Sequence, residues 1–265
     1  FNRKHKVGIV KDVNELTEAL AEVDLVIGGP PCQGFSNANR QRLIDDPRNQ
    51  LYKQFIRLVD LYQPKAVLME NVVGIKHRAD EIIEDYLSIG YYASFVELNA
   101  IQFKIPQNRK RVFFFACKYA EYAQRFKEKL EAVKKHDGFV LKDALSGLRV
   151  LKAKQIKNNT AFESEDVGYT EDSYTGSLDK AYAEFINRKN KAIGFMYNHK
   201  SRYNNERDIE IFRRLPQGAN STHESIANIM PYRRRNHVFK DKYFKLDETK
   251  PCKTITAHMK YDCNM

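Results

Sequence analysis

The chain is poor in cysteine and has no long apolar segment. These two features argue against disulfide-rich, zinc-binding and membrane-spanning classes of protein. Its four cysteines are Cys32, Cys117, Cys252 and Cys263. They form no Cys-x-x-Cys pair and have no histidine at metal-site intervals, which argues against a disulfide framework and against a zinc site. No apolar run approaches the roughly 18 residues that cross a bilayer, and the first residues lack the pattern of a secretory signal. We expect a protein of the reducing cytoplasm with no membrane segment and no bound metal.

Acidic residues are in the minority. Lys and Arg total 45, Asp and Glu total 34, and the formal net charge is +11. This charge favours a polyanionic partner, first of all nucleic acid, although charge describes association and not fold. Of the 265 residues 42% are hydrophobic, enough to bury a sizeable core in one large domain or in a domain with a smaller appendage.

Strand and helix patterns alternate through the first part of the chain. Continuous apolar runs at 24–29 and 65–69 predict buried strands, and apolar residues at helical intervals predict a helix at 48–62. Further helices are predicted at 79–89, 121–134 and 142–145, and further strands at 92–98 and 112–117. This alternation predicts a doubly wound α/β sheet, in which ligands bind beyond the carboxyl ends of the strands.

The second half of the chain has a different character. From about residue 152 it is polar and rich in tyrosine, with weak periodicity, so we expect a domain boundary near residue 150. Basic residues with aromatic neighbours cluster at 232–237 and at 240–245. Such clusters are typical of nucleic-acid-binding surfaces.

Three polar features follow or precede the predicted strands. Cys32 comes just after a strand, behind two prolines and before Gln33-Gly34, and reactive thiols lie in such partly exposed, electropositive places. Taken alone, Cys32 is as consistent with an inert side chain as with a reactive nucleophile. Glu70 ends the second predicted strand. Taken alone, it could equally be a residue that faces a ligand or simply the first solvated residue after the strand. The basic run Arg109-Lys110-Arg111, taken alone, is more readily a solvated charge cluster.

Taken together, these features resemble the signature blocks of the DNA cytosine-5 methyltransferase family. The order and approximate spacing of three blocks carry the resemblance: Gly-Pro-Pro-Cys-Gln-Gly-Phe-Ser at 29–36, Glu-Asn-Val at 70–72 and Gln-Asn-Arg-Lys-Arg at 107–111. The segments 11–13, 46–52 and 251–256 are similar to further family blocks. The resemblance implies a Rossmann-like methyltransferase sheet with a small, irregular target-recognition domain. It assigns residues 1–150 to the catalytic domain, 151–250 to target recognition and 251–265 to the return into the catalytic domain.

The resemblance also implies roles for the catalytic residues. Cys32 would add as a thiolate to carbon 6 of cytosine and so make carbon 5 nucleophilic. Glu70 would hydrogen-bond or protonate ring nitrogen 3, and we expect it to be buried in order to hold a proton near neutral pH. Arg111 would hold the exocyclic oxygen of the base, while Arg109 would brace the site or pair with Glu70.

The methyl donor implied by the family is S-adenosylmethionine. Asp12 would contact its adenine, Pro31 would lie beside it and Leu51 would line its pocket. On the substrate side the resemblance implies Gln33, Ser36 and Asn71, with Asn71 expected mainly to fix the turn around Glu70. The target base would be flipped out of the duplex, and the loop from residue 33 to about 49 would close over it.

Two family blocks have no counterpart in this sequence. They are the opening Phe-x-Gly-x-Gly loop with its acidic follower and the closing block with its final helix. A second polypeptide that supplies the ends, or a chain inactive by itself, would also account for this. We expect instead a trimmed piece of a longer enzyme.

Three other functions remain open at this point: methyl transfer to an amino nitrogen, cytosine-5 methylation of transfer RNA, and a catalytically silent nucleic-acid-binding module. A cysteine nucleophile would be superfluous for the first. The Gly-Phe-Ser that follows Cys32-Gln33 looks more like the DNA branch of the family, and intact Cys32, Glu70 and Arg111 argue against a silent module. We therefore expect a bacterial, cytoplasmic modification enzyme that acts on double-stranded DNA, of the kind that a cognate restriction endonuclease can accompany.

Overall fold

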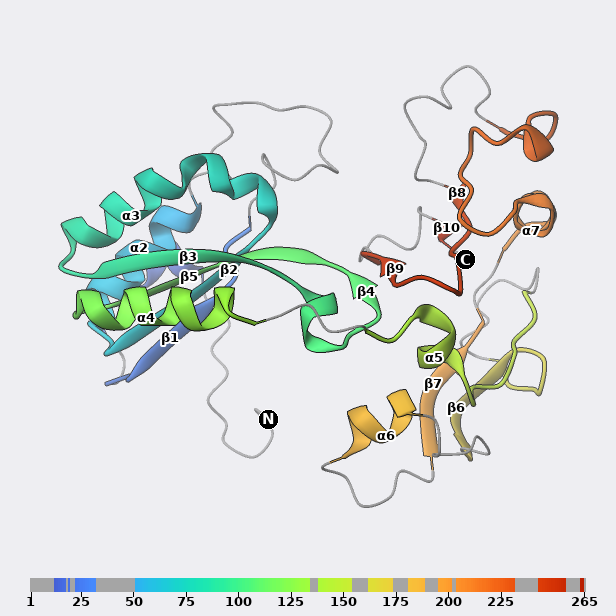
Figure 1. The fold of residues 1–265 in the computed structure, drawn as a ribbon, viewed down its shortest axis with the longest axis horizontal. Coiled ribbons are helices and arrows are strands. Elements are labelled where there is room, and N and C mark those ends of the chain that lie inside the picture. Colours follow the sequence, from blue (N-terminus) through green and yellow to red (C-terminus); the bar gives the residue numbers. More distant parts are fainter. Residues whose placement is uncertain are drawn as a thin grey trace. The chain divides into compact units, whose positions relative to one another are not determined.

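A computed structural model describes most of the chain (Figure 1). The residues it describes are 12–17, 19, 22–31, 51–133, 138–153, 162–173, 181–188, 195–201, 204–231, 243–255 and 263–264. The chain forms two packing units, the first made of Phe1–Gln102 and Lys110–Lys134 and the second of Phe103–Arg109 and Lys135–Met265. The functional boundaries expected near residues 150 and 250 remain a prediction.

A four-stranded mixed sheet forms the centre of the first unit. Its strands, in spatial order, are β1 (Leu25–Gly28), β2 (Ala66–Asn71), β5 (Lys110–Cys117) and β3 (Tyr92–Asn99). Strands β1 and β2 are parallel, whereas β5 is antiparallel to both of its neighbours. The segment between β3 and β5 is too short for a helical crossover, so the chain can only return antiparallel. The predicted strands and the α/β class are confirmed, and the mixed sheet is an addition to the expectation.

Helices cover both faces of this sheet. Helix α2 (Leu51–Tyr62) is amphipathic and buries Tyr52, Phe55, Ile56 and Val59. These side chains share one core with α3 (Ala79–Ser88) and with inward-facing strand residues such as Met69 and Phe114. Because side chains alternate along a strand, Phe115 faces the opposite side, where it stacks on Phe126 of α4 (Ala120–Glu131) at 4.5 Å.

Short 3-10 turns complete the first unit: η1 (Val13–Glu15), η3 (Val73–Arg78) and η4 (Ala100–Phe103). The arrangement of β1, β2 and β5 decides where polar groups meet. The carboxyl ends of the parallel strands β1 and β2 lie at one edge of the sheet, and the antiparallel strand β5 begins at that same edge. Residues that leave β1 and β2 and residues that enter β5 are therefore brought together.

The second unit consists of small sheets and short helices. A hairpin pairs β6 (Gly168–Ser173) with β7 (Phe195–Lys200), β4 (Gln107–Asn108) pairs with β9 (Cys252–Lys253), and β8 (Tyr243–Phe244) pairs with β10 (Cys263–Asn264). The helical elements are α5 (Leu141–Leu145), α6 (Ala181–Asn187), α7 (Glu206–Arg214) and η6 (Glu224–Ile226). None of the helices among the described residues is both long and apolar enough to span a membrane.

Tyr243 illustrates how the second unit uses its aromatic residues. It belongs to the basic and aromatic cluster at 240–245, yet its side chain is buried beside Ile211, Phe212 and Leu215. Its hydroxyl donates a hydrogen bond to Asp208 at 2.7 Å. Tyr243 therefore stabilises the small core and is not available as a stacking platform for a base.

Candidate active site

Two glycines let the loop after β1 pass close to its neighbours. A Cβ atom at Gly28 would stand 2.4 Å from a ring carbon of Phe55, so α2 packs directly against the end of β1. A Cβ at Gly29 would stand 3.3 Å from Oε2 of Glu70. A larger side chain at Gly28 would push the loop away from the helix, and one at Gly29 would displace the carboxylate of Glu70. The Gly-Gly pair before Pro30 and Pro31 thus has a packing reason.

Asn71 fastens this loop to the end of β2. Its side chain is buried, and Nδ2 donates a hydrogen bond to the carbonyl oxygen of Pro30 at 3.1 Å. Its Oδ1 accepts a hydrogen bond from the backbone N–H of Val72 at 2.8 Å. These two contacts match the turn-fixing role expected for Asn71, while a direct contact with substrate stays a prediction.

Glu70 and Arg111 form an ion pair at the same edge of the sheet. The two atoms Arg111 Nε and Glu70 Oε1 are 2.8 Å apart, and the side chains are 20% and 38% exposed, respectively. Arg111 also donates from Nη1 to the carbonyl oxygen of Lys110 at 2.7 Å. The structure thus pairs Glu70 with Arg111, a contact that the sequence had not assigned to Arg111. Glu70 is also more exposed than the burial expected for a proton donor.

Arg109 belongs to the other packing unit. It follows β4, and its backbone N–H donates to the carbonyl oxygen of Gln107 at 2.9 Å. Its role at the site stays a prediction.

The three residues expected at the methyl donor come from three segments of the first unit. Asp12 precedes η1 and is exposed; its Oδ1 accepts hydrogen bonds from the backbone and side-chain nitrogens of Asn14, both at 2.9 Å. Pro31 is exposed, and Leu51 is the half-buried first residue of α2.

Cys32, Gln33 and Ser36 lie outside the described residues. The described loop ends at Pro31, directly before the cysteine. Glu70, Arg111 and the loop that leads to Cys32 therefore belong to one edge of one sheet. A carboxylate and a guanidinium held at such an edge can bind and polarise a nitrogenous base.

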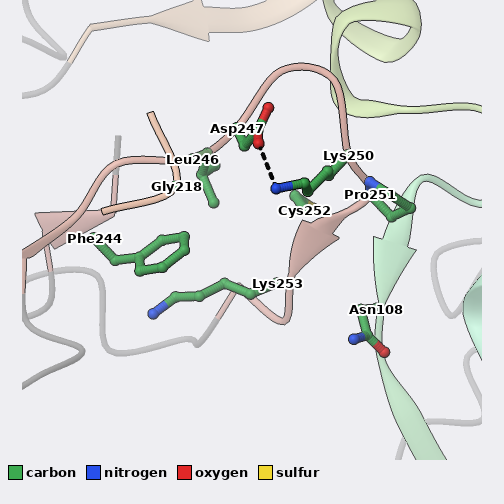
Figure 2. A pocket seen from close by; sticks show the side chains of 9 residues that line it. All are labelled: Asn108, Gly218, Phe244, Leu246, Asp247, Lys250, Pro251, Cys252 and Lys253. Carbon is green, nitrogen blue, oxygen red and sulfur yellow. Dashed lines mark ion pairs between the residues drawn. The ribbon is translucent and has the colours of Figure 1, made fainter. Parts of the chain in front are cut away.

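A cavity of about 170 Å³ in the second unit was not foreseen from the sequence (Figure 2). Its lining includes Phe244, Asp247, Lys250 and Lys253. Asp247 pairs with Lys250 at 2.9 Å, and Nζ of Lys253 lies 4.6 Å from the centre of the Phe244 ring. Hydrogen bonds, chiefly from Thr249 and then from Lys250, lower the pKa of Asp247 to about 2, so this carboxylate stays charged even at mildly acidic pH.

The cavity exists because two distant sequence blocks pair. Strand β4, from the block at 107–111, lies parallel to β9, from the block at 251–256. Nε2 of Gln107 contacts Sγ of Cys252 at 3.8 Å across a sequence separation of 145 residues, and Thr254 donates to the carbonyl oxygen of Asn108 at 3.0 Å. Both blocks were noted in the sequence, but the sequence carries no local signal that they touch.

Comparison with known proteins gives a consistent result. Residues 1–259 match the family model described as C-5 cytosine-specific DNA methylase. Type II methyltransferase M.DdeI of Desulfomicrobium norvegicum is 29% identical over 97% of this chain and 63% of its own length. Type II methyltransferase M.Bpa9945I of Bacillus paralicheniformis is 33% identical over 81% of this chain and 50% of its own length. The chain thus spans about half to two thirds of these relatives.

A solved structure supports the fold. It is described as a candidate DNA modification methyltransferase encoded within a prophage (E. coli). It has a TM-score of 0.59 with 22% sequence identity and covers 92% of this chain and 68% of its own.

Proposed function

This chain belongs to the C-5 cytosine-specific DNA methylase family, and we propose on that basis that the protein methylates carbon 5 of cytosine in double-stranded DNA. One observation carries the proposal. Glu70 and Arg111 come from two separate sequence blocks and meet in a 2.8 Å ion pair at the sheet edge where the loop toward Cys32 leaves β1. A base that enters at this edge would meet a carboxylate and a guanidinium that are already positioned, which is how electrostatic catalysis avoids reorganisation during the reaction.

Cys32 would supply the nucleophile. A bond forms between its thiolate sulfur and carbon 6 of the base, and the electron pair of the 5,6 double bond moves so that carbon 5 can attack a methyl group. S-adenosylmethionine, when bound, supplies that methyl group as an electrophile. Loss of the carbon 5 proton to a base then lets the bond from sulfur to carbon 6 break, which restores the aromatic ring and frees the thiolate.

Glu70 and Arg111 would stabilise the charge that appears on the ring. Attack by the thiolate pushes electrons toward nitrogen 3 and the exocyclic oxygen of cytosine. In its protonated form Glu70 would donate a hydrogen bond to nitrogen 3, and Arg111 would donate one to the oxygen, which would counter this charge. Before the base enters, the ion pair between Glu70 and Arg111 holds both groups in position, and Asn71 holds the loop carbonyl that leads to Cys32.

The residues proposed for the methyl donor fit its chemistry. Asp12 is exposed, and its carboxylate is a suitable acceptor for the exocyclic amine of adenine. Pro31 and Leu51 offer apolar surface that is partly open to solvent. These groups bind and orient a nucleoside, and none of them needs to take part in proton transfer.

Double-stranded DNA is proposed as the substrate because the net charge of +11 favours a polyanion. In the second unit, Lys250 and Lys253 bring positive charge to the cavity beside Phe244, and residues 151–250 are the proposed target-recognition region. Carbon 6 cannot be reached inside a stacked duplex, so the base would flip into the site, and the loop that carries Gln33 and Ser36 would close over it. A bacterial modification system with a cognate restriction endonuclease is the proposed setting.

Methyl transfer to defined nucleic acids tests this function. Purified protein is incubated with duplex DNA or transfer RNA and with S-adenosylmethionine that carries a labelled methyl group. The nucleic acid is then digested to nucleosides, which are separated and identified by mass spectrometry. We expect label in 5-methylcytosine from DNA only. Label from transfer RNA alone would move the protein to the RNA branch of the family, and no label from either would favour a silent module.

A further inference from the structure

Arg57 ties the segment around Asp12 to helix α2. Its Nη1 donates a hydrogen bond to the carbonyl oxygen of Leu16 at 2.7 Å, and its Nη2 donates to the carbonyl oxygen of Val13 at 2.5 Å. The remaining donor, Nε, binds Oε1 of Gln54 one turn earlier in the helix at 2.8 Å. All three nitrogens of one guanidinium are therefore engaged, and two of them hold the turn that Asp12 begins.

The chemistry of these contacts suits arginine and no other residue. Val13 begins η1 and Leu16 follows its last residue; the carbonyl oxygen of Val13 also accepts from the backbone N–H of Leu16 at 3.3 Å, so Arg57 adds a second donor to it. The planar guanidinium presents two N–H groups in a fixed fork, so it can reach both carbonyl oxygens at once, while Gln54 fixes the plane of the fork. A lysine ammonium carries its donors on one atom and cannot span both oxygens in the same geometry.

The contacts of Arg57 with Val13 and Leu16 connect two proposed donor-binding residues. Asp12 begins the clamped turn, and Leu51 begins the helix that carries Arg57. Leu51 and Gln54 lie one turn apart on the same side of α2. Hydrogen bonds from the Arg57 side chain thus fix the position of the turn that begins at Asp12 relative to helix α2.

We propose that Arg57 is a positioning residue for the adenine half of the methyl donor, acting through the turn of Asp12. This inference rests on the proposed function, because it takes S-adenosylmethionine as the ligand. Arg57 touches neither the donor nor the base in this role. Its loss removes none of the groups proposed for the chemical step, so the effect falls on donor affinity and not on that step.

Binding of S-adenosylhomocysteine, measured by titration calorimetry on the intact protein without DNA, tests the inference. We expect Arg57→Ala to weaken binding about tenfold, an effect in the range of one lost hydrogen bond, and Arg57→Lys to weaken it about threefold. Arg125→Ala, on the exposed side of α4 in the same unit, is the matched control and should bind like wild type. In turnover assays the KM for the donor should rise while kcat at saturating donor and the KM for DNA stay unchanged.

A double variant separates positioning from general stability. If Arg57 acts through Asp12, then Asp12→Ala with Arg57→Ala should bind no more weakly than Asp12→Ala alone. A double variant whose loss of affinity is the product of the two single losses would overturn the inference. So would an Arg57→Lys variant that binds as tightly as wild type, or an unchanged affinity in Asp12→Ala. Should Arg57→Ala fail to fold, Arg57→Lys decides. A wild-type protein that binds no S-adenosylhomocysteine would instead overturn the proposed function, so the two failures are distinct.

Discussion

Replacing Gly28 by alanine should destabilise the first unit. The new methyl group would stand 2.4 and 2.9 Å from two carbons of the Phe55 ring, where carbon atoms in contact keep about 3.5 Å. The ring is packed in the core with Tyr52, Ile56 and Val59, so it cannot withdraw into solvent. Overpacking of this kind costs about 1 to 3 kcal/mol. Denaturant unfolding should report a fall of that size in the free energy of unfolding of Gly28→Ala.

Two further variants test the reason and not only the effect. Phe55→Leu removes the ring atoms that collide, so adding Gly28→Ala to Phe55→Leu should cost less than about 0.5 kcal/mol. Gly29→Ala is the matched control, because its nearest neighbour is the Oε2 atom of Glu70 at 3.3 Å, the movable end of a side chain. We expect Gly29→Ala to keep stability and lose activity. A Gly28→Ala protein as stable as wild type would refute the packing argument.

Three other predictions concern the site and the cavity. Glu70→Gln should lower kcat by about 10² to 10⁴ in the methyl-transfer assay, with donor affinity unchanged; an effect on DNA affinity alone would make it a binding residue. Asn71→Ala should cost about 1 to 3 kcal/mol in denaturant unfolding and lower kcat as well, because the buried side chain loses its hydrogen bonds to Pro30 of the loop and to Val72; unchanged stability would contradict this. The pKa of Asp247 is lowered from 3.8 to about 2 by hydrogen bonds from Thr249 and Lys250, so its contribution to stability is complete above pH 3.8 and is lost as the pH falls through 2. Unfolding measured across this range should show a smaller loss for Asp247→Asn than for wild type, and parallel curves would argue against the contribution.

Local patterns were enough to predict the elements of the first unit. The apolar run at 65–69 and the helical spacing at 48–62 are properties of neighbouring residues, and β2 and α2 form there. Pairing depends on tertiary structure and could not be read in the same way. The antiparallel direction of β5, which brings Arg111 to Glu70, has no local signal, nor does the pairing of β4 with β9.

The second unit shows why polar segments resist prediction. Strands β6 and β7 lack a regular apolar alternation, and charged contacts tie the hairpin to other segments: Arg149 with Asp172 at 3.0 Å and Lys200 with Glu163 at 3.1 Å. Such pairs form only once the chain has folded. Arg57 is a similar case in the first unit, since an arginine on the flank of an amphipathic helix looks like a solvated residue until its two carbonyl partners are known.

The central claim is a covalent bond between Cys32 and the target cytosine. Duplex DNA that carries 5-fluorocytosine should trap this bond, because fluorine at carbon 5 cannot leave as a proton does. Wild-type protein and Cys32→Ala are incubated with this DNA, with and without S-adenosylmethionine, and scored for a denaturant-resistant complex by mass spectrometry. We predict an adduct that requires the donor, maps to Cys32 and is absent in the variant. An adduct on another residue, or methylation by Cys32→Ala at more than about a hundredth of the wild-type rate, would contradict the mechanism.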